Sequence, residues 1–201
     1  MQEGSPSVLI VGGGAAGRAC AQELRERGFV GMVEIVDAEP GGAIDRTLLD
    51  KGLLPGLLSR EQLALPPVEG VLVIPGEAVG ADFGNKTVEL RNGRRLAVDA
   101  VVIATGAAPH RPKGIDVASD VLLHHLHTAD DADALRQSMP LPEGRRVAVI
   151  GAGFSGTELA SHYVSAGAEV VLVGRSATPL LGALGAQLSP RLADLQRTRT
   201  D

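Results

Sequence analysis

The chain has 201 residues, enough for one domain or two, and its 44% hydrophobic content can fill a core. Its 19 basic and 24 acidic residues give a formal charge of −5 with no basic block, which argues against a nucleic-acid-binding protein. No apolar run reaches the roughly 20 residues of a membrane span, and the N-terminus lacks a secretory signal pattern. The single cysteine, Cys20, cannot form an internal disulfide, so we expect a protein of the reducing cytoplasm.

The first elements form one βαβ unit. Residues 7–11 read Ser-Val-Leu-Ile-Val, a continuous apolar run typical of a strand buried on both faces of a parallel sheet. A glycine cluster follows at 12–14, and the spacing of apolar residues over 15–27 predicts a helix. A second apolar run over 32–37 ends in Asp37 and predicts the second strand.

The next part of the chain predicts a loop and a small meander. Residues 38–57 are rich in turn formers without a clear period, so we expect a long loop with a short helix near 48–54. The turn signals Gly84-Asn85 and Asn92-Gly93 separate alternating segments that predict antiparallel strands. The expected strands are 71–74, 77–82, 87–90, 94–97 and, buried again in the main sheet, 99–105.

The βαβ pattern then returns. Prolines over 109–112 mark a boundary, and residues 128–139 predict a polar helix with acids in its first turns. A strand over 146–150, a glycine turn, a helix over 154–166 and a strand over 169–173 follow. Two copies of one unit imply two dinucleotide sites, or one site and one decayed copy.

Both glycine turns match the pattern G-x-G-x-x-G between a predicted strand and a predicted helix. In this pattern the first glycine makes a tight turn, the second lets the backbone approach a pyrophosphate, and the third lets helix and strand pack closely. The phosphate then lies on free N–H groups at the helix N-terminus. The alternative is a glycine-rich turn without a ligand. The candidate residues are Gly12, Gly14, Ala15, Ala16 and Gly17 in the first loop, and Gly151, Gly153, Phe154, Ser155 and Gly156 in the second.

In each βαβ unit, the residue that follows the second strand predicts which nucleotide binds. Asp37 lies 25 residues after Gly12, near the roughly 20 expected of an acid that binds a ribose hydroxyl, and Glu39 could share that role. In the second unit the same position is Gly174, followed by Arg175. An arginine there accommodates the 2′-phosphate of NADP, so this unit favours NADP over NAD. The alternative for Arg175 is a solvated arginine on a loop.

Several segments resemble a known family. Residues 44–51, Ile-Asp-Arg-Thr-Leu-Leu-Asp-Lys, are similar to the Tyr-Asp-Arg-Pro-Pro-Leu-Ser-Lys segment of FAD-dependent ferredoxin reductases, members of the pyridine nucleotide-disulfide oxidoreductase superfamily. Residues 104–106 resemble its Ala-Thr-Gly segment and residues 154–158 its Phe-Ile-Gly-x-Glu segment. Residues 128–132 resemble the start of its linker helix. The resemblance runs through residues 7–195 in order.

The repeated βαβ pattern predicts an α/β fold with two Rossmann-like dinucleotide-binding units and a small antiparallel meander over 77–97, and the resemblance implies that the second unit is incomplete. The expected organisation is an FAD-binding unit over 1–110, a linker with a helix over 111–144, and the start of an NAD(P)-binding unit over 145–201. The implied activity is that of an NAD(P)H oxidoreductase that passes electrons through FAD to a ferredoxin-like acceptor.

The resemblance also implies roles for single residues. Arg46 and Lys51 would contact FAD, with Lys51 near the flavin N5, where a cation stabilises the reduced anionic flavin. Glu158 would pair with Lys51 where the nicotinamide meets the flavin. Val79 would offer backbone groups to the adenine. The residues expected beside the FAD phosphates and ribityl chain are Ala104, Thr105 and Gly106.

The chain departs from the family at several positions. Ile44 stands for Tyr, Thr47-Leu48 for Pro-Pro, and Asp50 for the Ser beside the lysine, where a further negative charge would hinder flavin reduction. No Cys-x4-Cys pair exists, which excludes disulfide-reductase chemistry. His124, His125 and His127 lack ligand spacing, so we expect a surface cluster and no metal.

The family has a second FAD segment and an interface domain beyond the point where this chain stops. We therefore expect a truncated chain with weak FAD binding, no robust NAD(P)H oxidation, and self-association or a need for a partner chain. The alternatives to a working oxidoreductase are a non-catalytic nucleotide-binding fragment and one subunit of a split flavoenzyme.

Overall fold

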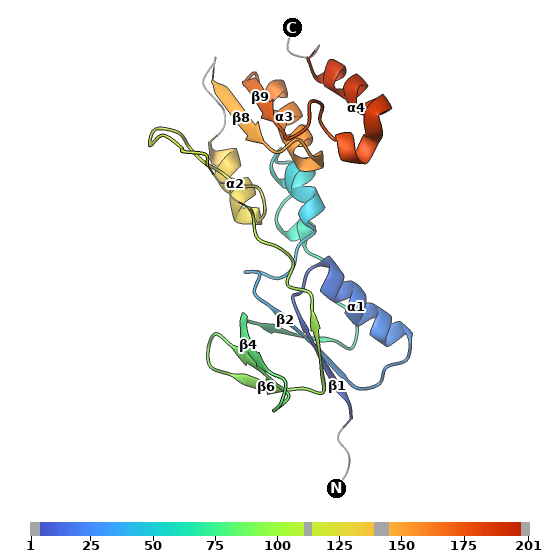
Figure 1. Ribbon diagram of the computed structural model, residues 1–201. Helices are drawn as coiled ribbons and strands as arrows, with labels where there is room; N and C mark the ends of the chain where they lie inside the picture. The colour runs from blue at the N-terminus through green and yellow to red at the C-terminus, as the bar shows by residue number, and fades with distance from the viewer. Residues whose placement is uncertain (1–4, 111–113, 139–144, 198–201) are drawn as a thin grey trace. The chain divides into compact units, whose positions relative to one another are not determined.

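The computed structural model describes residues 5–110, 114–138 and 145–197, and the chain forms two compact units. One unit contains residues 1–46 and 60–110, and the other contains residues 47–59 and 111–201 (Figure 1). The sequence assigned residues 47–59 to the first unit, whereas in the structure they belong to the second. The physical reason is Leu54, which is 1% exposed and packs in a core cluster with Leu135 and Tyr163.

The first unit has a four-stranded parallel sheet. Strands β1 (Ser7–Val11), β2 (Met32–Asp37), β3 (Leu72–Pro75) and β7 (Ala100–Ile103) lie in the order β3-β2-β1-β7. All three strand pairings are parallel. Helix α1 (Ala15–Glu26) connects the two central strands (Figure 1). This arrangement brings the carboxyl ends of β1 and β2 to one edge of the sheet, beside the start of α1.

An antiparallel sheet covers one face of the parallel sheet. It consists of β4 (Ala78–Asp82), β5 (Thr87–Leu90) and β6 (Arg95–Ala97). The predicted meander is therefore confirmed. Apolar side chains of both sheets share one core cluster, in which Leu9 and Val36 meet Val88 and Leu90. Helix α1 packs on the opposite face through a second cluster that contains Ile10 and Ala21.

The second unit has a two-stranded parallel sheet of β8 (Arg146–Ile150) and β9 (Glu169–Val173). Its helices are α2 (Ala129–Gln137), α3 (Phe154–Ser165) and α4 (Leu181–Arg197). The short helices of the chain are η1 (Arg46–Leu48), η2 (Leu49–Leu53) and η3 (Glu61–Leu63). Leu54, Leu135, Tyr163 and Ala168 form the buried cluster that joins the end of η2 to α2 and α3.

Helix α4 differs from the sequence-based expectation, which assigned no element after 173. Two features of its sequence hide it. Pro190 lies inside the helix, and Gly185 has φ 72°, so that two helical segments meet at a kink. Both residues ordinarily indicate the end of a helix, which explains why the pattern did not predict one. Across the described residues, no helix is both long enough and apolar enough to cross a membrane.

Helix α2 has a capping box at its N-terminus. The Thr128 hydroxyl accepts a hydrogen bond from the Asp131 amide at 3.1 Å, and the Asp131 carboxylate accepts one from the Thr128 amide at 2.8 Å. The same carboxylate also accepts a hydrogen bond from the His127 amide at 3.0 Å. The cap therefore satisfies backbone donors that would otherwise lack partners.

Replacing Thr128→Ala is expected to destabilise the second unit by about 1 kcal/mol, because the helix loses a side-chain acceptor at its N-cap. In a chain of this size the loss corresponds to a fall in Tm of about 2–4 °C. Thermal unfolding followed by circular dichroism measures it. Thr128→Ser keeps the hydroxyl and serves as the control. Equal Tm values for the alanine and serine variants would contradict the assigned cap.

Candidate functional site

The first glycine loop brings helix α1 very close to the strands. Gly12 has φ 112°, and its amide donates a hydrogen bond to the Val36 carbonyl at 2.8 Å. A Cβ on Gly12 would overlap the carbonyl oxygen of Ala104, and a Cβ on Gly17 would overlap the carbonyl oxygen of Gly12. The glycines are therefore required by close backbone contacts as well as by the left-handed φ at Gly12.

The N-terminus of α1 is suited to an anion. Gly14 is the N-cap residue and the helix begins with Ala15 and Ala16. No side chain caps this end, and the first turn contains no acidic residue. The first-turn N–H groups and the positive end of the helix dipole thus face the loop, an arrangement that binds phosphate groups.

Asp37 lies at the end of β2, next to the loop. Its side chain is buried, and its Oδ1 accepts a hydrogen bond from the Glu39 amide at 3.1 Å. Its Oδ2 is also buried and has no hydrogen-bond partner among the described residues. A buried acceptor without a donor is costly, and a ribose hydroxyl would supply the missing donor. This orphaned oxygen and the glycine cradle beside it fit the adenosine part of FAD.

The other predicted FAD residues of the first unit lie at loops and strand ends. Glu39 forms an ion pair with Arg46, the last residue of the first segment of this unit. Val79 lies in an irregularity of β4, where Ala78 pairs with Leu90 and Gly80 with Glu89, so its backbone is left out of the ladder. The residues that follow β7 are Ala104, which donates its amide to the Val11 carbonyl at 2.8 Å, and the exposed Thr105 and Gly106.

The second glycine loop repeats the geometry of the first. Gly151 has φ 121°, and its amide donates to the Val173 carbonyl at 2.8 Å. Gly153 is the N-cap residue of α3, and a Cβ on Gly156 would overlap the Gly151 carbonyl oxygen. The first residues of the helix, Phe154 and Ser155, are exposed. The second unit therefore has the same helix N-terminus, free of acids in its first turn, as the first unit.

The register of the strands identifies the residue that corresponds to Asp37. Val36 pairs with Val11 next to the first loop, and Val173 pairs with Ile150 next to the second. The following residue is Asp37 in one unit and Gly174 in the other. Arg175 comes next, and its side chain is exposed. The second unit therefore presents a cation and no acid at the end of its second strand.

Lys51 and Glu158 form an ion pair within the second unit. Lys51 lies on η2, a π-helical turn closed by the hydrogen bond from the Leu54 amide to the Leu49 carbonyl at 2.8 Å. Glu158 lies in the first turns of α3, and its Oε2 is 3.1 Å from the Lys51 Nζ. π-Helical turns occur often at functional sites. The structure thus brings together the two residues for which the resemblance implied a role between nicotinamide and flavin.

Asp50 is a third member of this charged group. Its side chain is only 7% exposed and lies 3.8 Å from the Lys51 Nζ. Burial and the hydrogen-bonded, negatively charged Glu158 raise the pKa of Asp50, against the attraction of Lys51. The hydrogen bond from Asp50, and then Lys51, lower the pKa of Glu158. Of the two carboxyl groups, Asp50 therefore protonates before Glu158 as pH falls, and Lys51 lies beside the group that stays ionised to lower pH.

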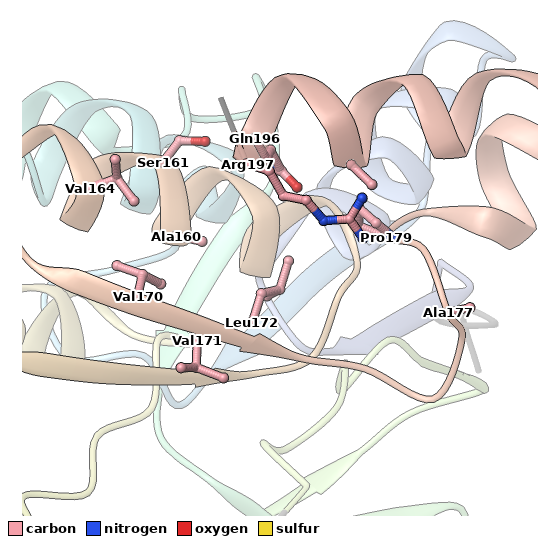
Figure 2. A pocket seen from close by; sticks show the side chains of 11 residues that line it. Ala160, Ser161, Val164, Val170, Val171, Leu172, Ala177, Pro179, Gln196 and Arg197 are labelled. Atoms are coloured by element: carbon pink, nitrogen blue, oxygen red, sulfur yellow. The ribbon is translucent and has the colours of Figure 1, made fainter. Parts of the chain in front are cut away.

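A cavity of about 370 Å³ lies between α3, β9 and α4 (Figure 2). Side chains of Ala160, Val164, Val170 and Leu172 point into it, and Arg197 lies at its α4 side. Neither the second glycine loop nor the charged residues Asp50, Lys51 and Glu158 line this cavity. None of the residues expected to bind a cofactor lines it.

The three histidines, expected to form a surface cluster, are half-buried and lie just before α2. The described part of the chain contains no group of three or more His, Cys, Asp or Glu side chains that could hold a metal ion.

Two features of the candidate sites were not predicted from the sequence. One is the hydrogen bond between Asp50 and Glu158, and the other is the close approach of Ala152 to Gly174. Both connect residues that are distant in sequence.

Comparison with known proteins assigns the family. Residues 6–199 match the family described as pyridine nucleotide-disulphide oxidoreductase. The chain belongs to this family. It is 34% identical over 193 residues to the "Probable ferredoxin reductase CtmF" of Castellaniella defragrans, covering 92% of this chain and 46% of that protein. It is 33% identical to rhodocoxin reductase of Rhodococcus erythropolis, covering 91% and 44%.

Solved structures of the family have the same fold. The putidaredoxin reductase of a covalent complex with putidaredoxin matches with a TM-score of 0.83 and 27% identity, covering 98% of this chain and 49% of that chain. The ferredoxin reductase for the CYP199A2 system of Rhodopseudomonas palustris matches with a TM-score of 0.84 and 28% identity, covering 96% and 48%. The chain thus spans about half the length of the relatives it matches.

Asp50→Asn is expected to stabilise the protein at neutral pH. Because folding raises the Asp50 pKa, its contribution to stability is complete below the ordinary aspartate value of about 3.9 and is lost as pH rises through the folded pKa. Asparagine keeps the hydrogen bond to Glu158 without ionising. The Tm of the variant minus that of the unchanged protein should therefore increase from pH 4 to pH 8.

Thermal unfolding between pH 4 and pH 8 measures this difference. Asp120→Asn, on an exposed loop of the same unit, is the matched control and is expected to show no such trend. A constant difference for Asp50→Asn across the pH range would refute the assigned proton position.

Proposed function

We propose that this chain provides the FAD-binding unit and the nicotinamide-nucleotide unit of an FAD-dependent NAD(P)H oxidoreductase of the ferredoxin reductase type. When bound, FAD would accept a hydride from NAD(P)H and release electrons one at a time to a ferredoxin-like protein. The first glycine loop and Asp37 would hold the FAD pyrophosphate and ribose. The second loop would hold the pyrophosphate of the nicotinamide nucleotide.

The observation that carries the proposal is the Lys51–Glu158 ion pair at 3.1 Å, beside the second glycine loop. A lysine whose side chain is 53% exposed is available to a ligand, and the glutamate fixes its position. Such a cation favours an electron-rich group next to it. Two nucleotide loops alone fit a binding module, whereas this positioned cation adds the electrostatics that a redox site needs.

We further propose NADP(H) as the preferred nucleotide. Gly174 and Arg175 support it, because the end of β9 has a cation and lacks the acid that binds the 2′-hydroxyl of NAD. Some relatives are named as NAD(+) reductases, among them the ferredoxin–NAD(+) reductase component of the biphenyl dioxygenase system of Paraburkholderia xenovorans, 32% identical over 165 residues. The nucleotide choice of this chain therefore depends on its own residues.

Asp50 favours a second candidate, a nucleotide-binding protein without electron transfer. At a pH where it ionises, Asp50 would add a negative charge 3.8 Å from the Lys51 Nζ and weaken the effect of the cation. Anaerobic reduction by NADPH across a pH series separates the two candidates. The oxidoreductase should reduce bound flavin at least where Asp50 holds its proton, whereas the binding protein should not reduce it at any pH.

Lys51→Gln is expected to slow flavin reduction by about tenfold or more, because one charge-assisted interaction of about 1.5 kcal/mol is lost. The purified chain is incubated with FAD, titrated by flavin fluorescence, and mixed anaerobically with NADPH while the flavin absorbance is recorded. Lys86→Gln, a lysine of the first unit paired with Asp99, is the control. A chain that binds neither FAD nor NADPH, or a Lys51→Gln variant with an unchanged rate, would refute the proposal.

Arg175→Ala is expected to weaken NADPH binding by about tenfold and to leave NADH binding unchanged, because only NADPH has a 2′-phosphate for the guanidinium. Titration calorimetry with each nucleotide measures both affinities. Arg191→Ala, an exposed arginine of α4, controls for a general loss of positive charge. Tighter NADH than NADPH binding in the unchanged protein would contradict the proposed preference.

A further inference from the structure

The two glycine loops differ at one pair of facing positions. The residue after the first glycine is Gly13 in the first unit and Ala152 in the second. The residue after the second strand is Asp37 in the first unit and Gly174 in the second, as the strand registers show. Each unit therefore has one glycine and one residue with a side chain, at exchanged positions.

These two positions touch in both units. A Cβ on Gly13 would lie 2.9 Å from the Cβ of Asp37, and a Cβ on Gly174 would lie 2.6 Å from the Cβ of Ala152. Carbon atoms in favourable contact are about 3.5–4.0 Å apart. The space between the loop and the end of the second strand thus accepts one side chain, from one position or the other.

Ala152 cannot move aside. Its methyl group has no rotamers, and its carbonyl accepts a hydrogen bond from the Leu180 amide at 2.9 Å. The preceding residue, Gly151, is tied to β9 by its bond to the Val173 carbonyl. The loop is thereby attached to the chain on both sides of Gly174, so a side chain at 174 would have to displace backbone rather than a flexible side chain.

We propose that Ala152 determines the nucleotide specificity of the second unit by excluding any side chain, and hence any acid, from position 174. The inference rests on the proposed function of this unit as a nicotinamide-nucleotide site. With position 174 restricted to glycine, Arg175 is the first side chain after β9 that a ligand can meet. A nucleotide with a 2′-phosphate is then favoured over one with a free 2′-hydroxyl, which would need the excluded acid.

The stability test uses the full chain without ligand. Gly174→Ala and Gly174→Asp are expected to lower Tm by about 2–4 °C or more, since overpacking by one side chain costs about 1 kcal/mol or more. Adding Ala152→Gly should restore most of the loss in both cases. Gly182→Ala is the matched control, because a Cβ at Gly182 meets nothing within 4 Å. Tm values for the Gly174 variants that equal the control, or that Ala152→Gly does not restore, would overturn the proposal.

The binding test uses NADH and NADPH separately. Gly174→Asp alone should gain no affinity for NADH, whereas Ala152→Gly with Gly174→Asp should shift the NADH to NADPH preference about tenfold towards NADH. A gain in the single variant equal to that in the double variant would overturn the assignment to Ala152. Restored Tm values with no binding of either nucleotide to any form would refute the proposed function, and the nucleotide choice that rests on it, while the coupling of the two positions would stand.

Discussion

The contact between the first and third glycines of each loop is the constraint on which both candidate sites depend. A side chain at Gly17 or Gly156 would overlap the carbonyl oxygen of Gly12 or Gly151, so the helix can lie against the turn only if the third position is glycine. This close packing aims the first-turn N–H groups at the loop. It also sets the helix between two parallel strands, whose register brings the end of the second strand to the same loop. The position of the helix N-terminus and that of the residue after the second strand both follow from one backbone contact.

The second unit adds an electrostatic arrangement to this frame. The cation is Lys51, on the π-helical turn η2, and the anion paired with it is Glu158, on helix α3 after the glycine loop. Asp50, buried beside them, would make the group negative if both carboxyl groups were ionised. Burial and Glu158 raise the pKa of Asp50, whereas Asp50 and Lys51 lower the pKa of Glu158, so Asp50 is the carboxyl group of the two that protonates first as pH falls. A residue that departs from the family pattern is thus accommodated without removing the charge of Lys51.

Local sequence patterns predicted most of the fold. The strands at 146–150 and 169–173 were expected at the residues where they occur, because continuous apolar runs between turn residues leave little ambiguity. Asp37 could be placed beside the first loop because strand spacing and parallel pairing determine its position. Helix α4 could not be predicted, since Gly185 and Pro190 interrupt its pattern. The assignment of residues 47–59 also failed to follow from the sequence, because an apolar residue such as Leu54 does not indicate which core will bury it.

The path of the chain has a consequence for biosynthesis. Residues 47–59 are translated before the first unit is complete, yet Leu54 belongs to a core whose other members are Leu135, Tyr163 and Ala168. Domains generally fold in the order in which they leave the ribosome. The first unit can close once residue 110 has emerged, while Leu54 stays uncovered until helices α2 and α3 have been synthesised. The nascent chain therefore carries an uncovered apolar side chain between two segments of a unit that can already fold.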